Sequence, residues 1–179
     1  MNQRVPSSEP VITCFLELRR PGQLRPVAPP LPEAVVRQAR TPCPGVNRMF
    51  YEKIGRAWQW TARLAWSESQ WRAYVARPEL TTWIGYVADT PFGYFELETQ
   101  PEGAVEIAIF GVLPGFTGQR LGGFLLTEAV RAAWSLGGRR VWLHTCSLDH
   151  PAALPNYQAR GFTLYRKTDQ PVTRPAPPV

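Results

Sequence analysis

A glycine-bearing turn between an apolar strand and a helical pattern is the segment best suited to bind a ligand. Residues 111–126 read GVLPGFTGQRLGGFLL, with Gly118 in the turn and Gly122 and Gly123 at the start of the helical pattern. Glycine lets a backbone approach a ligand closely, and the unpaired amides that begin a helix attract negative charge. The segment therefore favours an anion such as a pyrophosphate, to which Arg120 could add a formal charge. A tight turn without a ligand is the alternative, since neither a P-loop nor a G-x-G-x-x-G pattern is present.

Acidic residues inside apolar strand patterns are a second chemical feature. Glu106 lies within AVEIAIFGV, where burial is costly without a partner and would make the carboxylate a stronger base. Glu96 and Glu98 share one face of the preceding predicted strand and could attract a cationic amine. A salt-bridged or solvated sheet face is the alternative for all three.

The segment HTCSLDH, residues 144–150, contains four types of metal-ligating side chain. Strand alternation places His144 and Cys146 on one face, whereas Asp149 and His150 fall in a turn before a helix. No second cluster of metal-ligating side chains exists, and His144 and His150 are the only histidines of the chain. We therefore predict no metal site.

Aromatic residues are concentrated between residues 50 and 74, where Trp58, Trp60 and Trp66 surround a WQWTARLAW segment. An aromatic pocket would suit a hydrophobic amine or a cation. The alternative is that these rings form core.

The elements that must position these residues follow from periodicity and turn signals. Helices are predicted at 46–58, at 67–76 behind a capping box that Ser67 opens, from Leu121 to a stop at 136–138, and at 151–160. Strands are predicted at 11–19, 34–40, 81–88, 92–99, 104–112, 140–146 and 162–166.

The order of these elements predicts the fold class. Three closely spaced strands form an antiparallel meander, and a βαβ crossover through the glycine-bearing turn follows it. The class is therefore α+β (α/β mixed sheet) with helices on both faces. Proline crowds both ends of the chain, so we expect a flexible N-terminus at 1–10, one domain at 11–167 and a Pro-rich flexible tail at 168–179.

The charge of the chain favours an anionic partner. Twenty Lys and Arg against 14 Asp and Glu give a net charge of +6. The basic residues are dispersed and no RNA-binding motif occurs, which argues against nucleic acid. The N-terminus lacks a signal-peptide pattern, and no apolar run approaches the ~20 residues that cross a bilayer. We expect a cytoplasmic protein that makes no contact with a membrane.

Between residues 104 and 162 the sequence resembles the GNAT superfamily of acyl-CoA-dependent N-acyltransferases. The acyl-CoA loop of that superfamily, [Q/R]-x-x-G-x-[G/A], aligns with residues 117–122, where Gly122 fits but Thr117 and Arg120 depart from the pattern. The C-terminal Y-x-x-x-G-F signature is matched by Tyr157 through Phe162.

The resemblance implies a role for each matched position. Tyr157 would protonate the thioester sulfur, and Glu106 would take a proton from the amine directly or through water. In that superfamily the two N-terminal helices and their connection form a wall of the acceptor pocket, so Trp58, Trp60 and Trp66 would bind the acceptor, and Glu96, by its place on the preceding strand face, could attract its amine. The implied acetyl-CoA contacts are Val112 through its backbone, Thr117, Gly118, Gln119, Arg120, Leu121, Gly122, Gly123, His150 and Asn156. A packing tyrosine and a helix-surface asparagine are the alternatives for Tyr157 and Asn156.

The sequence thus predicts a metal-independent N-acetyltransferase. It would transfer an acetyl group from acetyl-CoA to a primary amine of a small molecule or peptide, directly within a ternary complex. A non-catalytic acyl-CoA-binding or regulatory module is the alternative, and an enzyme that acetylates aminoacyl-tRNA is a weaker one. A homodimer is compatible with the sequence, which does not define the acceptor.

Overall fold

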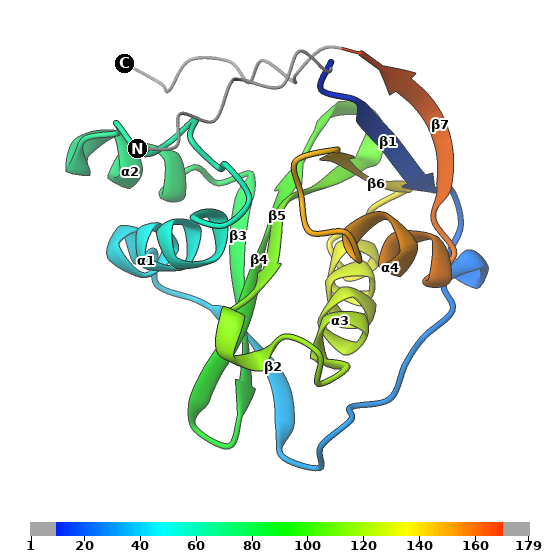
Figure 1. Ribbon diagram of the computed structural model, residues 1–179, viewed down its shortest axis with the longest axis horizontal. Helices are drawn as coiled ribbons and strands as arrows, with labels where there is room; N and C mark the ends of the chain where they lie inside the picture. The colour runs from blue at the N-terminus through cyan, green and yellow to red at the C-terminus, as the bar shows by residue number, and fades with distance from the viewer. Residues whose placement is uncertain (1–9, 170–179) are drawn as a thin grey trace, which may run out of the picture.

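Seven strands form one sheet in the computed structural model, which describes residues 10–169. In spatial order the strands are β2, β3, β4, β5, β6, β1 and β7 (Figure 1). Their bounds are β1 Thr13–Leu18, β2 Ala34–Ala39, β3 Leu80–Val87, β4 Thr90–Thr99, β5 Ala104–Val112, β6 Arg140–Cys146 and β7 Thr163–Thr168. The helices are α1 Pro44–Gly55, α2 Glu68–Val75, α3 Leu121–Ser135 and α4 Ala153–Ala159.

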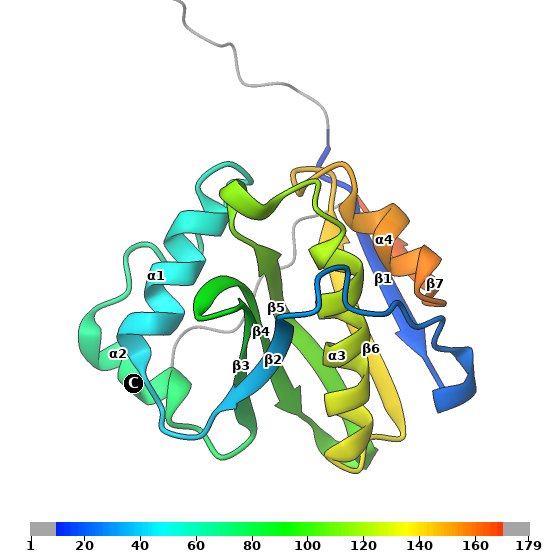
Figure 2. The same ribbon diagram turned by 90° about the horizontal axis from the view of Figure 1, so that it is seen from below.

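The sheet combines an antiparallel meander with one parallel crossover. Strands β2 to β5 pair antiparallel in chain order, whereas β5 pairs with β6 in parallel through the connecting helix α3. Helices α1 and α2 cover one face, and α3 and α4 cover the other (Figures 1 and 2). The predicted α+β class with helices on both faces is confirmed.

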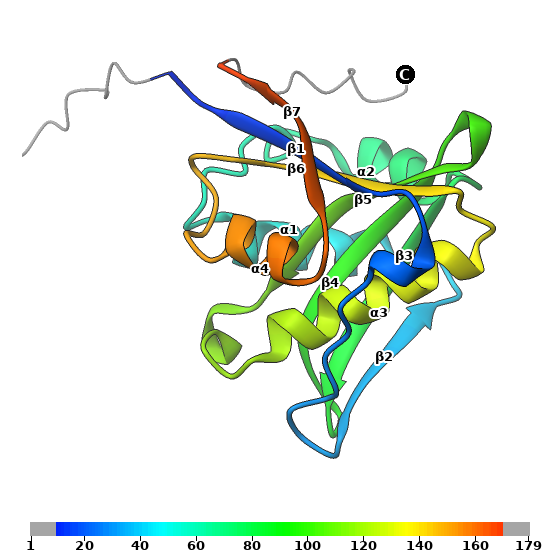
Figure 3. The ribbon, with the colours of Figure 1, turned by 90° about the vertical axis from the view of Figure 1, so that its right-hand side faces the viewer.

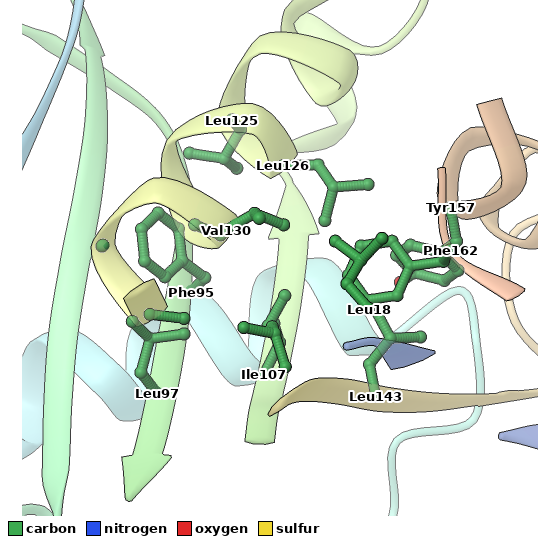
Figure 4. Close-up of a cluster of buried hydrophobic side chains, with 14 of the residues drawn as sticks. Leu18, Phe95, Leu97, Ile107, Leu125, Leu126, Val130, Leu143, Tyr157 and Phe162 are labelled. Carbon is green, nitrogen blue, oxygen red and sulfur yellow. The ribbon is translucent and has the colours of Figure 1, made fainter. Parts of the chain in front are cut away.

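Two hydrophobic clusters fill the two faces. Under α3, Leu125, Leu126 and Val130 pack toward Leu97 and Ile107 of the sheet (Figure 4). Under α1 and α2 a second cluster is richer in aromatic rings and includes Phe50, Ile54, Trp71, Tyr94 and Ile109. Because each cluster is built from one stripe of a helix and one face of the strands, the sheet carries a core on both sides.

The feature that prepares a binding site is the separation of β5 from β6. Their pairing runs only from Ala104 opposite Arg140 to Glu106 opposite Trp142. The register of β5 against β4 shifts between Ile107 and Ile109, so that Ala108 is an extra residue. Such a bulge bends a strand and re-aims its side chains. Strand β5 therefore leaves β6 after Glu106.

Beyond β6 the sheet is completed by the first and the last strand, β1 and β7. Strand β1 lies between β6 and β7 and pairs antiparallel with both (Figure 3). Within residues 10–169, no helix is long and apolar enough to cross a membrane. The predicted flexible ends at 1–10 and 168–179 lie outside the described residues, apart from Pro10, Thr168 and Asp169.

Helix boundaries show where local pattern was sufficient. The capping box of α2 is present, with the Ser67 hydroxyl accepting from the Gln70 amide at 3.2 Å. The predicted continuation of the first helix to residue 58 is wrong, because α1 ends at Gly55. There the amides of Trp58 and Trp60 both donate to the Gly55 carbonyl, and a Cβ on Gly55 would lie 2.4 Å from Trp60 Cβ. The chain folds back over a position that only glycine can occupy.

Candidate active site

A cavity of about 890 Å³ opens where β5 and β6 separate. Its walls include the second half of β5, the turn that begins α3, the end of β6, helix α4, and α1 with the α1–α2 connection, and Val11 before β1 and Thr13 at its start also line it. The sequence-predicted site residues that line it are Trp58, Trp60, Val112, Thr117, Gly118, Arg120, Gly122, Gly123, His150, Asn156 and Tyr157. The fold thus brings together residues from five separate segments.

The turn before α3 has the backbone geometry of an anion site. Gly118 has φ +85°, and Arg120, the N-cap of α3, has φ +63° and makes no side-chain cap. The first amides of α3 are therefore without a side-chain cap and carry the positive end of the helix dipole. A Cβ on Gly122 would meet its nearest atoms at 3.8 and 3.9 Å, so the wall is open there.

Two residues of the predicted loop do not line the cavity. Leu121 is fully buried in the core beneath α3. Gln119 turns its side chain back along the loop, where Nε2 donates to the Gly115 carbonyl at 3.1 Å. Both residues therefore stabilise the conformation of the loop and do not form the surface that faces the cavity.

Tyr157 lies on the cavity wall and is buried. Its ring packs edge-on against Phe110 of β5 and against Phe162. Burial raises the pKa of Tyr157 well above its ordinary value, and the negative charge of Asp149 adds to the effect. The phenol therefore keeps its proton at neutral pH and is available as a donor.

Polar contacts fix the neighbouring helix α4 against the loop. Asn156 Nδ2 donates to the Gly122 carbonyl at 3.3 Å, which ties α4 to the first turn of α3. His150 Nδ1 accepts from the Ala152 amide at 3.0 Å, and the His150 ring stands edge-on to Trp58 with centroids 4.8 Å apart.

Asp149 is a cavity residue for which the sequence predicted no cavity contact. Its Oδ2 accepts from the Thr145 hydroxyl at 2.7 Å and the Cys146 amide at 2.9 Å, while Oδ1 accepts from Trp60 Nε1 at 3.2 Å. The carboxylate thereby joins the loop after β6 to the α1–α2 connection. A turn-forming aspartate was visible in the sequence, but its tryptophan partner, 89 residues away, was not.

Trp66 lies apart from Trp58 and Trp60, the other two tryptophans predicted to bind the acceptor substrate. It packs on Trp71 and Tyr74 and is not part of the cavity wall. Its ring lies 5.2 Å from the Arg63 guanidinium, which also stacks on Tyr74 at 4.0 Å. Trp66 thus encloses a buried cation that belongs to the chain itself.

Glu96 is the partner of that cation. It is completely buried, and its oxygens accept from Asn47 at 2.8 Å, Arg63 at 3.1 Å and Tyr74 at 2.7 Å. Burial alone would lower the pKa of Arg63, but Glu96 outweighs it and holds that pKa above its ordinary value. The structure does not bring Glu96 to the cavity wall, whereas Arg63 reaches it.

Strands β5 and β6 diverge beyond Glu106 and form a wedge that is closed at this residue. Glu106 itself stands just outside the cavity wall. Its Oε2 accepts from Gln100 Nε2 at 3.0 Å, and its Oε1 lies 3.4 Å from His144 Nδ1. His144 itself lines the cavity, together with Cys146 two residues further on. Among residues 10–169, no group of three or more His, Cys, Asp or Glu side chains is placed to hold a metal ion.

Most of the chain that forms this cavity matches a known protein family. The model of the "Acetyltransferase (GNAT) family" matches residues 46–162, which include both the loop and Tyr157. No curated protein matches the chain.

Several solved structures share the fold. A GCN5-related N-acetyltransferase from Kribbella flavida is 17% identical, with a TM-score of 0.61 over 87% of this chain and 56% of its own. An aminoglycoside acetyltransferase from an uncultured soil metagenomic sample, in complex with trehalose, is 10% identical, with a TM-score of 0.60 over 72% of this chain and 87% of its own. An IAA acetyltransferase from Bacillus cereus is 20% identical, with a TM-score of 0.55 over 74% of this chain and 79% of its own. The chain spans about half the length of the Kribbella protein.

Proposed function

Because the chain belongs to the acetyltransferase (GNAT) family, we propose that it transfers an acetyl group from acetyl-CoA to a primary amine within a ternary complex. The observation that carries the proposal is the wedge between β5 and β6. It opens on one side to the amide-rich start of α3 and on the other to an aromatic wall. An acyl donor and an acceptor can therefore meet inside one cavity.

The donor half is supported by the turn at residues 117–123. The amides that begin α3 suit a pyrophosphate, and Arg120 adds a formal charge at the same place. Beyond Glu106 the strand β5 is not paired with β6, so its edge can receive an extended pantetheine arm as an added strand. Val112 lies at the end of that edge.

The acceptor half is supported by the α1–α2 connection. Trp58 and Trp60 line the cavity there, beside Tyr51 and Ile54 of α1. These side chains form an apolar wall. Arg63 also reaches the cavity, but its charge is already neutralised by Glu96. A wall of this kind favours an amine attached to an apolar or aromatic group.

The pKa of the Cys146 thiol in the cavity wall supports direct transfer of the acetyl group from acetyl-CoA to the amine. Burial raises the pKa of Cys146, and the neighbouring Asp149 charge raises it further. Because the thiolate is the nucleophilic form of cysteine, Cys146 is poorly suited to carry the acyl group. The amine would instead attack the thioester carbonyl itself, with Glu106 drawing away its proton and Tyr157 protonating the departing sulfur.

The proposal is tested by thiol release from acetyl-CoA against a panel of amino acids, polyamines, aminoglycosides, arylalkylamines and peptides. Tyr157→Phe keeps the ring contacts with Phe110 and Phe162 but removes the donor. We expect it to lower kcat about 100-fold while the calorimetric Kd for acetyl-CoA is unchanged. Acetyl-CoA binding by the wild type without turnover of any amine would instead identify a non-catalytic acyl-CoA-binding module. Failure to bind acetyl-CoA at all would refute both.

A further inference from the structure

His144 occupies a defined position at the base of the wedge. It lies on β6 two residues beyond Trp142, the last residue that β6 pairs with β5. Alternation along β6 buries Val141, Leu143 and Thr145 on the α3 side and places His144 on the opposite face. Helix α1 covers that face of the sheet, opposite α3 (Figures 1 and 2). His144 lines the cavity, and 17% of its side chain is exposed.

The imidazole is backed by an oriented carboxylate. His144 Nδ1 lies 3.4 Å from Glu106 Oε1, a separation at which the two groups form an ion pair when the imidazole is protonated. Nδ1 is buried and makes no hydrogen bond within residues 10–169, so Glu106 is the acceptor that faces it. The other oxygen, Oε2, accepts from Gln100 Nε2 at 3.0 Å, and Gln100 Oε1 accepts from Trp142 Nε1 at 3.0 Å. This chain of contacts holds Glu106 in place and leaves Oε1 directed at His144.

The two residues differ in their access to the cavity. His144 is on its wall and Glu106 is not. With Nδ1 facing Glu106, Nε2 is the ring nitrogen available to a molecule in the cavity. A carboxylate behind a histidine fixes the tautomer with its proton on the near nitrogen and stabilises the imidazolium that forms when the far nitrogen accepts another.

From this geometry, and resting on the proposed function, we propose that His144 Nε2 takes the proton from the acceptor ammonium and that Glu106 is the residue that positions and stabilises it. Glu106 then acts through an imidazole rather than on the amine itself. Phe15 and Trp142, whose rings lie 5.9 and 6.3 Å from that of His144, restrict the movement of the imidazole.

The protons balance in this sequence of steps. An ammonium, R–NH₃⁺, gives one proton to Nε2, and the nitrogen lone pair attacks the thioester carbonyl. The C–N bond forms and the C–S bond breaks, with its electron pair leaving on sulfur. The sulfur receives the Tyr157 proton, Tyr157 regains one from the substrate nitrogen, and the amide keeps the last. His144 returns its proton to water, so the net products are the amide, CoA and one proton.

The first test compares variants in the acetyl-CoA and amine assay. We expect His144→Gln to lower kcat by about 100-fold or more, and Glu106→Gln by about 10-fold or more, with the Kd for acetyl-CoA unchanged in both. The matched control is Glu98→Gln, because Glu98 is opposite Glu106 on β4 but binds Arg77 at 2.8 Å and does not line the cavity. Glu98→Gln should keep the wild-type kcat.

A second readout does not depend on turnover. The chain has two histidines, so His144→Gln assigns the His144 signals in ¹⁵N NMR. We expect neutral His144 of the wild type to carry its proton on Nδ1, and the preference for that tautomer to weaken in Glu106→Gln. A proton on Nε2 in the wild type, or wild-type kcat in His144→Gln, would overturn this inference alone. Absence of turnover by the wild type with every amine would overturn the proposed function as well.

Discussion

Two regions of the sheet contain a buried glutamate and have opposite characters. Under α1 and α2, Glu96 is enclosed with Arg63, and the two charges meet within the chain. At the closed end of the wedge, Glu106 stands behind a histidine that lines a cavity. Both acids lie in apolar strands, yet one neutralises an internal cation and the other stands next to solvent-accessible space. Both partners reach the cavity wall, so what separates the two regions is the chemistry of the partner: an imidazole can exchange a proton, whereas a guanidinium keeps its charge.

The largest effect is expected from breaking the Glu96–Arg63 pair, and it is an effect on the stability of the fold. Glu96→Gln leaves the Arg63 guanidinium, whose side chain is 2% exposed, without its counter-charge. Removing one partner of a buried pair costs about 3–5 kcal/mol, so the free energy of unfolding in urea should fall by that amount. Glu98→Gln weakens a pair that is partly exposed and should cost about 1 kcal/mol or less. Equal losses in the two variants would contradict the structural role of Glu96.

A smaller effect is expected in the wedge, on ligand affinity rather than on stability. Gly122→Ala adds a methyl group with no protein atom closer than 3.8 Å, so the fold should tolerate it. The methyl group would occupy space against the start of α3, and we expect the calorimetric Kd for acetyl-CoA to rise about 10-fold, which is about 1.4 kcal/mol.

The matched control for this variant is Gly115→Ala. A Cβ added at Gly115 would have no atom within 4 Å, and Gly115 does not line the cavity. Gly115→Ala should therefore keep the wild-type affinity. An unchanged Kd in Gly122→Ala would remove Gly122 from the proposed donor site.

The smallest effect concerns a third glutamate, Glu17 of β1, whose partners are Arg19, which follows β1, and Arg140 at the start of β6. Burial alone would raise the pKa of Glu17, but hydrogen bonds from Arg19 and Arg140 outweigh it and lower the pKa below its ordinary value. A lowered pKa in the folded state adds stability above the unfolded pKa of about 4.3, and this is lost as pH falls through the folded pKa. The difference in unfolding free energy between wild type and Glu17→Gln should therefore shrink from pH 7 to pH 3. A difference that stays constant would show that the ion pairs contribute nothing.

Local pattern was enough for most of the elements. Alternation, the Ser67 capping box and the glycine stop after α3 each act over a few residues, and the corresponding strands and helices are present. The first helix was predicted to run past Gly55 because Trp58 continues its apolar stripe. What ends the helix is the chain folding back over Gly55, a contact that the stripe does not encode.

The family, the order of elements and the glycine-bearing turn could be predicted from the amino-acid sequence, because these depend on neighbouring residues and on spacing. Which acids and rings meet the cavity depends on how distant segments pack. The Glu96–Arg63 pair, the Trp60–Asp149 contact and the Glu106–His144 pair join positions 33 to 89 residues apart. Such partners are set by where β5 leaves β6 and by how the α1–α2 connection packs, and neither is a local property of the chain.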